Sequence, residues 1–261
     1  MKIGLALSGG GALGAAHIGA LEEMEKRGVG FDRICGTSAG AIIGLLYADG
    51  GLDAVHAFLH SFKASGMLAS PFSLIARTPR QIFTHVRDVL DKTVRVSSFD
   101  ELAMTFSCVA TDIATGEMVV MDKGDPVAAV MASASYPGVL EVQKLNGRLL
   151  IDGGATRNLP ADILRQQGAE FVIGSSVYAL AELKVDKGRA GLSRIRALAR
   201  AFEIMQSEMS RLQIEKCDFC FIPPVQAYAW YDFADVDAIL EIGRRHARKR
   251  VGELMRLLDK V

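Results

Sequence analysis

The chain has 261 residues, of which 50% are hydrophobic and 23% are charged, and this is enough to build the core of one large α/β domain. Its 30 basic residues balance 30 acidic ones, so no overall field attracts nucleic acid or an acidic partner, and recognition has to be local. The 4 cysteines are too few for a disulfide framework in a chain of this length and are expected to be reduced.

The chain starts with a short apolar run that is interrupted early. Glycines at positions 9–11 and His17 stand where the apolar stretch of a signal peptide would continue, so the sequence does not favour export. The longest apolar run, residues 39–48, is shorter than the ~20 residues that cross a bilayer. We therefore expect a cytoplasmic protein that is soluble or lies on a membrane surface.

Two strand–loop–helix units open the chain. Parallel strands joined by a right-handed helical crossover place their following loops at the same edge of a sheet, so we expect the two loops to be neighbours. The predicted ranges are 2–8 and 31–35 for the strands, 9–14 and 36–40 for the loops, and 15–27 and 41–48 for the helices.

Strand and helix patterns fill the rest of the chain without a repeat, a low-complexity tract or a linker, which favours a single layered α/β domain over residues 1–261. The pair Asn146-Gly147 lies between two of the strands and predicts a two-residue hairpin. The remaining strands are expected at 105–110, 117–121, 140–145, 148–151, 171–175 and 217–222, and the helices at 53–62, 80–90, 126–133, 192–214 and 236–258.

The first glycine loop fits two uses. Gly9, Gly11 and Gly14 match the dinucleotide fingerprint G-x-G-x-x-G, but Cys35 occupies the place of the acidic residue that would hold a ribose. The same loop, at a helix N-terminus, can instead direct backbone N–H groups at a developing negative charge, as an oxyanion hole does. A non-catalytic module that binds a nucleotide or an anion is the alternative.

The second loop reads I-C-G-T-S-A-G and places Ser38 between Gly36 and Gly40 directly behind a strand. This is the pattern of a serine nucleophile on a sharp strand-to-helix turn. A glycine-flanked turn in which Thr37 or Ser38 caps the helix would look the same. The neighbouring glycine loop favours the nucleophile, because attack by the serine on an ester would create an oxyanion beside that loop.

A histidine is the usual base for such a serine, but no histidine of this chain suits the role well. His56, His60 and His85 fit ordinary helix faces, and His246 stands in a strongly basic helix. His17 follows the glycine loop and is better explained as a local support for that loop than as the base.

Asp152 is the stronger candidate for the base. It follows an apolar strand and precedes Gly153 and Gly154, which permit a turn that presents the carboxylate to a neighbour. To accept a proton from Ser38 it would have to be partly desolvated and bonded directly to the hydroxyl. A surface Asp-Gly-Gly turn is the alternative.

The only C-x-x-C pair, Cys217 and Cys220, falls in a predicted strand, where residues three apart face opposite sides of the sheet. No histidine or second C-x-x-C accompanies it. We therefore expect neither a metal site nor a disulfide, and we interpret both residues as core packing.

Four motifs, in this order, resemble the patatin-like phospholipases, in particular the short bacterial members related to the neuropathy target esterase catalytic domain. They are G-G-G-A-L-G-A-A-H-I-G-A-L, G-T-S-A-G, A-S-A-S-Y-P-G, and D-G-G followed by N-L-P. They cover residues 2–160, and a weaker likeness in I-P-P-V and W-Y-D-F-A-D-V-D-A-I-L-E-I-G extends to the last helix. The resemblance implies a three-layer α/β/α fold with a mostly parallel central sheet and a nucleophile elbow.

The resemblance also implies a Ser–Asp dyad without a catalytic histidine. It makes Ser38 the nucleophile and Asp152 the general base, and it assigns the oxyanion hole to Gly9, Gly10 and Gly11. The implied activity is hydrolysis of acyl esters in phospholipids, lysophospholipids or related lipids through an acyl-serine intermediate, with no metal or cofactor. An acyltransferase or thioesterase with the same dyad is the alternative.

Two positions depart from the family pattern. Leu13 stands where members often carry Arg or Lys, and Glu141 stands where they commonly carry proline. For access of a lipid, the apolar segment 66–79 is a candidate lid or interfacial patch, or else a loop packed on the body. The basic stretch 244–250 fits a solvated helix face better than a surface for anionic headgroups.

Overall fold

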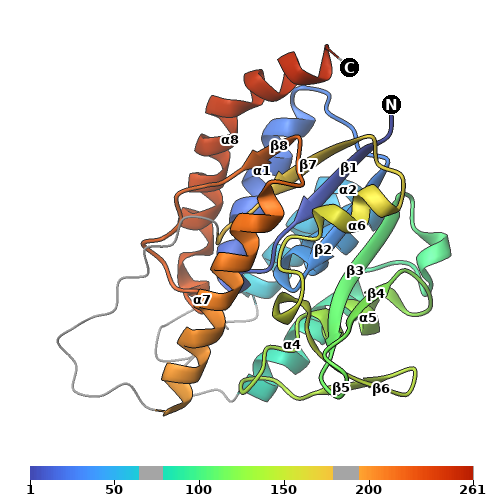
Figure 1. The fold of residues 1–261 in the computed structure, drawn as a ribbon, viewed down its shortest axis with the longest axis vertical. Coiled ribbons are helices and arrows are strands. Elements are labelled where there is room, and N and C mark those ends of the chain that lie inside the picture. Colours follow the sequence, from blue (N-terminus) through green and yellow to red (C-terminus); the bar gives the residue numbers. More distant parts are fainter. Residues whose placement is uncertain (65–78, 179–193, 261) are drawn as a thin grey trace.

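The structure is a computed structural model and describes residues 1–64, 79–178 and 194–260 (Figure 1). Within these residues, eight strands form one mixed sheet in the order β5-β6-β3-β2-β1-β7-β8, and β4 pairs with β3. The strands are β1 (Ile3–Leu7), β2 (Arg33–Thr37), β3 (Thr105–Asp112), β4 (Met118–Met121), β5 (Gln143–Leu145), β6 (Arg148–Asp152), β7 (Phe171–Ser175) and β8 (Phe219–Phe221).

The centre of the sheet is parallel and one side of it is antiparallel. The pairs β1–β2, β1–β7, β2–β3 and β7–β8 are parallel, whereas β3–β4, β3–β6 and β5–β6 are antiparallel. The predicted hairpin joins β5 to β6, where Asn146 and Gly147 both have positive φ, at 50° and 77°. Two positive φ values are what a type I′ turn requires, so the hairpin prediction is confirmed.

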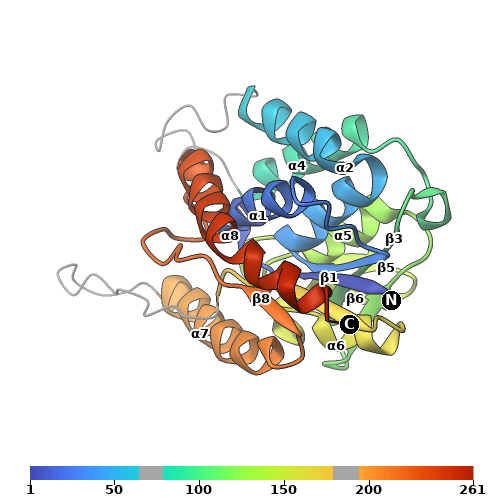
Figure 2. The same ribbon diagram turned by 90° about the horizontal axis from the view of Figure 1, so that it is seen from above.

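Helices cover both faces of the sheet, which confirms the predicted three-layer α/β/α architecture (Figure 2). One face carries α1, α2, α4, α5 and α8, and the other carries α6 and α7. Their bounds are α1 (Ala15–Glu25), α2 (Ala39–Ala64), α4 (Pro79–Thr93), α5 (Pro126–Ser133), α6 (Ala161–Gln166), α7 (Arg194–Ile214) and α8 (Val236–Leu258).

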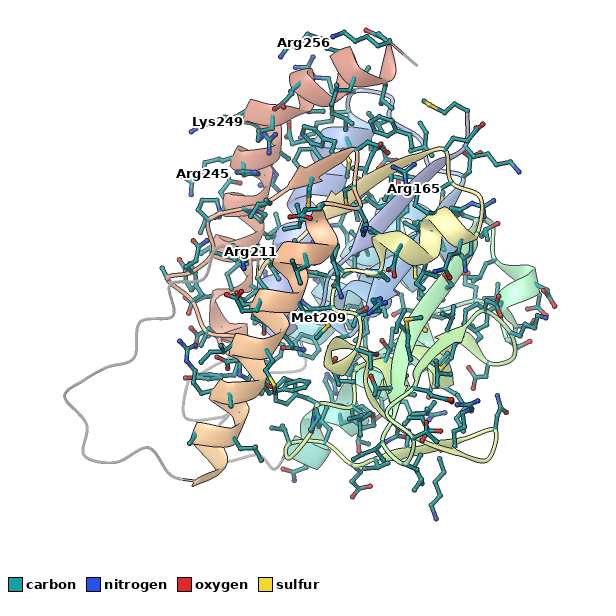
Figure 3. The ribbon with its side chains drawn as sticks, in the orientation of Figure 1. Arg165, Met209, Arg211, Arg245, Lys249 and Arg256 are labelled. Atoms are coloured by element: carbon teal, nitrogen blue, oxygen red, sulfur yellow. The ribbon has the colours of Figure 1, made fainter. Side chains whose placement is uncertain are left out.

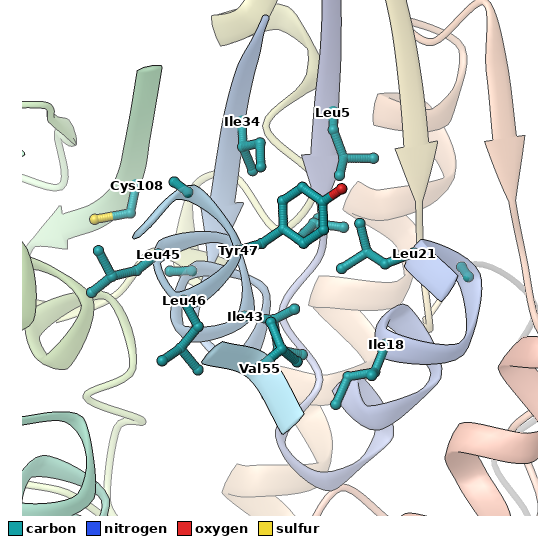
Figure 4. Packing of buried hydrophobic residues seen from close by; sticks show 14 of the residues in the cluster. Leu5, Ile18, Leu21, Ile34, Ile43, Leu45, Leu46, Tyr47, Val55 and Cys108 are labelled. Carbon is teal, nitrogen blue, oxygen red and sulfur yellow. The ribbon is translucent and has the colours of Figure 1, made fainter. Parts of the chain in front are cut away.

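The side chains of each strand point alternately to the two faces of the sheet, so the sheet separates two hydrophobic cores. Leu5 and Leu7 of β1 pack on the α1/α2 side, while Ala6 between them packs on the α6 side. Successive residues of a strand point to opposite faces, so a strand covered on both faces is apolar throughout. The larger core joins β1 and β2 to α1 and α2 through Ile34, Leu21 and their neighbours (Figure 4).

Helix α2 consists of two helical halves that meet at Gly50 and Gly51, where the sequence predicted a separation between two helices. The backbone leaves helical geometry at these two glycines, and the helix continues beyond them after a kink. By length and composition alone α2 is long and apolar enough to cross a membrane, a criterion that buried core helices also meet. In the fold, Leu45 and Leu46 of its first half are fully buried in the core.

The interpretation of the C-x-x-C pair as residues on opposite sides of one strand was wrong. Strand β8 begins at Phe219, so Cys217 precedes it and is free to turn toward Cys220. A Cβ on Gly174 would lie 2.6 Å from the sulfur of Cys217 and 2.8 Å from that of Cys220, so both thiols meet over β7. All 4 cysteines are unpaired, and Cys220 is buried.

Candidate active site

Ser38 and Asp152 meet because two strands that run in opposite directions end against the same edge of β3. Strand β2 pairs with β3 in parallel as far as Thr37, which lies opposite Val109. Strand β6 pairs antiparallel with the following residues of β3, starting from Asp152 opposite Ala110. Since β4 occupies the other edge of β3 along this stretch, the carboxyl ends of β2 and β6 face each other.

The turn at Ser38 has the geometry of a nucleophile elbow. Ser38 has a φ of 53°, which is uncommon for a residue other than glycine. Its backbone N–H donates to Ser133 Oγ at 2.9 Å, and the Ser133 hydroxyl donates to the Val109 carbonyl at 2.6 Å. The fully buried Ser133 thus ties the turn to β3, a role the sequence analysis missed although Ser133 lies in the motif A-S-A-S-Y-P-G.

The glycines around the turn allow backbone segments to touch. A Cβ on Gly36 would collide with the backbone of Gly40, and a Cβ on Gly40 would collide with the backbone carbonyl of Leu7. A Cβ on Gly14 would lie 2.8 Å from the Cβ of Ala39, so the first turns of α1 and α2 are in contact. The glycine loop and the serine turn are therefore neighbours, as the sequence predicted.

Asp152 is 1% exposed and is held by the turn that follows it. Its Oδ1 accepts a hydrogen bond of 2.7 Å from the backbone N–H of Gly154. A Cβ on Gly153 would collide with the carbonyl of Val109, so this glycine lets the turn approach β3 closely. The alternative of an exposed surface turn does not fit this burial.

Burial raises the pKa of Asp152 from 3.8 to about 6, and the hydroxyl of Ser38 and the N–H of Gly154 offset this only in part. No Ser38–Asp152 hydrogen bond of regular geometry forms, and Asp152 Oδ2 is buried without a partner among the described residues. Catalytic hydrogen bonds are often long before substrate binds. The arrangement thus joins a serine hydroxyl to a desolvated carboxylate.

The glycine loop offers fewer free donors than the sequence analysis expected. The N–H of Gly9 already donates to the carbonyl of Asn158 at 3.1 Å. Within the described part of the chain, the N–H groups of Gly10 and Gly11 have no hydrogen-bond partner, and both residues line the same cavity as Ser38. The candidate oxyanion donors of the loop therefore narrow from three glycines to Gly10 and Gly11.

The side chain of His17 holds the glycine loop in place through hydrogen bonds of both ring nitrogens. Its Nε2 lies 3.0 Å from the carbonyl oxygen of Ser8, and its Nδ1 lies 2.8 Å from Ser175 Oγ. A carbonyl can only accept, so Nε2 carries the proton and Nδ1 accepts from the Ser175 hydroxyl. Burial lowers the pKa of His17 to about 4, so the ring stays neutral. Both ring nitrogens are used in holding the loop.

The other histidines lie away from Ser38. His246 accepts a backbone hydrogen bond beside β8 and packs on Phe221, and burial lowers its pKa. His56 lies 3.3 Å from Glu22, and His85 packs on a phenylalanine ring of α2. Among the residues that the structure describes, no histidine lines the cavity at Ser38, and no group of three or more His, Cys, Asp or Glu is placed to hold a metal.

Leu13 and Glu141, the two departures from the family pattern, occupy different surroundings. Leu13 is 5% exposed and belongs to the larger core, whereas Glu141 is exposed. An apolar side chain suits the core environment of Leu13. The glycine loop therefore has no basic side chain at that position.

A cavity of about 540 Å³ opens at Ser38 and Asp152. Volumes of this size are typical of sites that bury a drug-sized ligand. Both halves of the kinked α2 line it with apolar side chains, and α1, α4 and α8 contribute others. The α2 side chains are Ile42, Ile43, Leu46, Val55, Phe58, Leu59 and Phe62.

Polar and aromatic groups that were not predicted from the sequence also lie at the cavity. Tyr136 stacks on Trp230 at 4.8 Å between ring centroids and meets Phe202 of α7 edge to face at 5.1 Å. Gln206, also on α7, lines the cavity and is 2% exposed. The W-Y-D-F segment and the polar residues of α7 were visible in the sequence, but nothing local linked them to Ser38.

Comparison with known proteins identifies the family of the chain. The patatin-like phospholipase family matches residues 5–165. A patatin-like phospholipase domain-containing protein of Caenorhabditis elegans is 30% identical and covers 97% of this chain and 21% of its own. The lysophospholipase NTE1 of Coccidioides immitis is 28% identical over 97% of this chain and 18% of its own.

The chain spans less than half the length of the curated relatives it matches first. Among solved structures, VipD from Legionella pneumophila covers 99% of this chain and 67% of its own, with 13% identity and a TM-score of 0.49. The family match extends from β1 into α6 and includes the serine turn and the Asp-Gly-Gly turn. The chain belongs to the patatin-like phospholipase family.

Proposed function

We propose that the protein hydrolyses acyl esters of lipids, of the phospholipase A or lysophospholipase type, through an acyl-serine intermediate on Ser38. The observation that carries the proposal is the meeting of a strained serine turn and a buried carboxylate at the head of an apolar cavity. Relatives named as patatin-like phospholipases and lysophospholipases support the class of substrate.

In the first half of the reaction, Ser38 Oγ attacks the ester carbonyl carbon while Asp152 takes the hydroxyl proton. The developing oxyanion faces the free N–H groups of Gly10 and Gly11, and each such donor is worth about 3 to 4 kcal/mol in mutational work. When the carbon–oxygen bond to the alcohol breaks, Asp152 returns the proton to the leaving oxygen. A pKa of about 6 suits both tasks near neutral pH.

The shape of the cavity supports a fatty acyl chain as the group transferred to Ser38. Its lining beyond the serine turn is almost entirely aliphatic and aromatic, so an extended hydrocarbon chain gains free energy by leaving water there. In the described part of the chain no lysine or arginine lines the cavity, which argues against the alternative of a nucleotide-binding loop.

We further propose that the protein works in the cytoplasm at the surface of a membrane, with the outer face of α7 toward the lipid. Leu198, Met205 and Leu212 recur every seven residues and are 69%, 57% and 60% exposed. An exposed apolar face of this kind is typical of an interaction surface. The candidate lid 66–79 lies, apart from residue 79, outside the described residues.

The basic stretch of α8 contributes less to this surface. Arg244 pairs with Glu22 at 2.6 Å, and Arg248 pairs with Glu23 at 3.1 Å. Arg245 and Lys249 extend from the outer side of the helix (Figure 3). Since part of the stretch is used in ion pairs with α1, a solvated and partly paired helix face remains the better interpretation.

The proposal is tested with p-nitrophenyl esters and lysophospholipids of increasing chain length, on the wild type and on Ser38→Ala. We expect turnover that improves with chain length in the wild type and is lost in Ser38→Ala. His246→Ala is the matched control and should keep the wild-type rate. A folded wild type that turns over no ester, or an equally active Ser38→Ala, would contradict the proposal.

A further inference from the structure

We propose that Gln206 of α7 is a positioning residue for the second half of the reaction, in which it orients the water molecule that releases the acyl group from Ser38. The inference rests on the proposed function and adds a residue from outside the stretch matched by the family, residues 5–165. It concerns hydrolysis of the acyl-enzyme and not its formation.

The Gln206 amide lies against the turn that carries Asp152. A Cβ on Gly154 would collide with Gln206 Nε2 and would lie 2.9 Å from Asp152 Oδ1. The amide and the carboxylate are therefore neighbours across the Cα of Gly154. Gln206, Asp152 and Ser38 all line the same cavity.

Two acceptor atoms in this group have no donor. Gln206 Oε1 and Asp152 Oδ2 are both buried without a hydrogen-bond partner among the described residues. A buried acceptor that stays unpaired costs about 1 to 3 kcal/mol, so such atoms in a native protein call for an explanation. A water molecule has two O–H donors and would satisfy one acceptor on each residue.

Formation of the acyl-enzyme removes a hydrogen-bond donor from Asp152, which a water molecule can replace. In the free enzyme, the hydroxyl of Ser38 and the N–H of Gly154 are the two donors that stabilise the Asp152 carboxylate. Once Ser38 Oγ is esterified it has no hydrogen left, so the carboxylate loses the serine donor. The attacking water replaces it with one O–H group, and its second O–H group is free to donate to Gln206.

The step then balances as follows. The water oxygen bonds to the acyl carbonyl carbon, one of its protons moves to Asp152, and the carbonyl oxygen becomes an oxyanion. The bond from that carbon to Ser38 Oγ breaks, Asp152 returns the proton to Oγ, and the fatty acid leaves. Gln206 accepts a hydrogen bond from the O–H group that is not transferred, which fixes the direction of the oxygen lone pair.

Two other polar residues on the buried face of α7 accept hydrogen bonds from the same loop. Ser210 Oγ accepts from Asn158 Nδ2 at 2.8 Å, and Gln213 Oε1 accepts from the backbone N–H of Leu159 at 2.7 Å. Neither of the two α7 residues lines the cavity. Gln213 is thus a matched control for Gln206, with the same side chain on the same helix against the same loop.

The test uses an alcohol as a competing nucleophile. Methanol has one O–H donor, which goes to Asp152, so its attack does not require Gln206, whereas the attack of water does. The wild type, Gln206→Leu and Gln213→Leu are given a p-nitrophenyl ester in methanol–water, and the rates of p-nitrophenol, fatty acid and methyl ester formation are measured. Acyl-enzyme on Ser38 is followed by intact-protein mass.

For Gln206→Leu we expect the rate of hydrolysis of the acyl-enzyme to fall about 10- to 100-fold while acylation changes little. The acyl-enzyme then accumulates, and the ratio of methyl ester to fatty acid rises by a similar factor. Gln206→Glu keeps an acceptor oxygen and should restore a ratio of methyl ester to fatty acid near that of the wild type. The added negative charge beside Asp152 should raise the pKa of Asp152 and so shift the acid limb of the pH profile to higher pH. Gln213→Leu should leave the ratio unchanged.

A purely structural role of Gln206 would lower acylation, hydrolysis and methanolysis together and leave the ratio as it is in the wild type, and this result would overturn the inference. It would leave the proposed function intact as long as Ser38 is acylated. If Ser38 of the wild type is never acylated, the proposed function fails and the inference fails with it.

Discussion

The two sides of the central sheet differ in what they bury next to Ser38. On the α1/α2 side the side chains that line the cavity are aliphatic and aromatic, whereas α7 lines it with Gln206 and buries Ser210 and Gln213 farther along the helix. Helix α7 turns Gln206, Ser210 and Gln213 inward, and its outer side carries Leu198, Met205 and Leu212 together with the exposed ion pair of Glu208 and Arg211. An ordinary surface helix instead turns an apolar stripe toward the core.

The difference separates two tasks. An apolar wall gains free energy by covering a hydrocarbon chain but cannot hold a loop in register. The hydrogen bonds that Asn158 and Leu159 donate to side chains of α7 are directional, and they fix the loop that follows Asp152. We infer that the α2 side selects the acyl chain while the α7 side keeps the base in place.

The largest expected effect comes from removing the base. Asp152→Asn keeps the shape of the side chain but cannot take the proton of Ser38, so kcat should fall by about 10²- to 10⁴-fold. In the wild type, kcat/KM should rise with pH through the pKa of Asp152 at about 6 and then level off, because the ionised form is the base. Ester turnover by Asp152→Asn at the wild-type rate would contradict the account.

The same substitution should stabilise the fold. The pKa of Asp152 is about 6 in the folded state and 3.8 in the unfolded chain, so the folded state binds the proton more tightly. The wild type therefore loses stability as the pH rises from about 4 to about 6, because the buried carboxylate becomes ionised. We expect Asp152→Asn to raise the free energy of unfolding by up to about 3 kcal/mol near pH 8. The gain should vanish as the pH falls through about 4, which urea unfolding at both pH values would measure.

A smaller effect is expected from moving the oxyanion donors. The Cβ of Gly10→Ala would collide with Val177 and push the loop away from Ser38, so kcat should fall by about 10²-fold with little change in KM. The double variant Gly10→Ala/Val177→Ala removes the collision and should recover part of the rate. Equal rates for the single and double variants would show that the collision is not the cause.

The smallest effect concerns the apolar wall. Ile42 lies one helical turn from Ser38 and lines the cavity, so Ile42→Phe should shorten the preferred acyl chain and lower kcat/KM for long chains by about 10-fold. Short esters should react as in the wild type. Leu198→Phe, on the exposed face of α7, is the control. In assays without detergent, its chain-length preference should be that of the wild type. An unaltered chain-length profile for Ile42→Phe would place the acyl chain elsewhere.

How far the sequence predicts the site depends on how local each feature is. The glycine loop, the Ser38 turn and the Asn146-Gly147 hairpin follow from a few adjacent residues, and the structure confirms the placement of both loops and the hairpin. The six residues of α6 are too few to produce a periodic pattern, so that helix was missed. Glycines at 50–51 indicated a break between two helices, and the backbone leaves helical geometry at both of them.

The remaining parts of the site depend on pairing between distant segments. Asp152 reaches Ser38 because β6 and β2 end at consecutive residues of β3, and this register involves segments far apart in the chain. The bond of Gly9 to Asn158 and the position of Gln206 have the same origin. Polar residues at 206, 210 and 213 share one face of α7 and were a signal, but they resemble a solvent-facing stripe until the helix is placed.

The most direct test of the account labels the nucleophile. A fluorophosphonate is added to the wild type, Ser38→Ala, Asp152→Asn and His17→Ala, and the rate and site of modification are determined by mass spectrometry. We predict a single adduct on Ser38 in the wild type, none in Ser38→Ala, labelling slowed by at least about 10²-fold in Asp152→Asn, and a smaller loss in His17→Ala. Labelling of Asp152→Asn as fast as the wild type, or an adduct on another residue, would contradict the Ser38–Asp152 dyad.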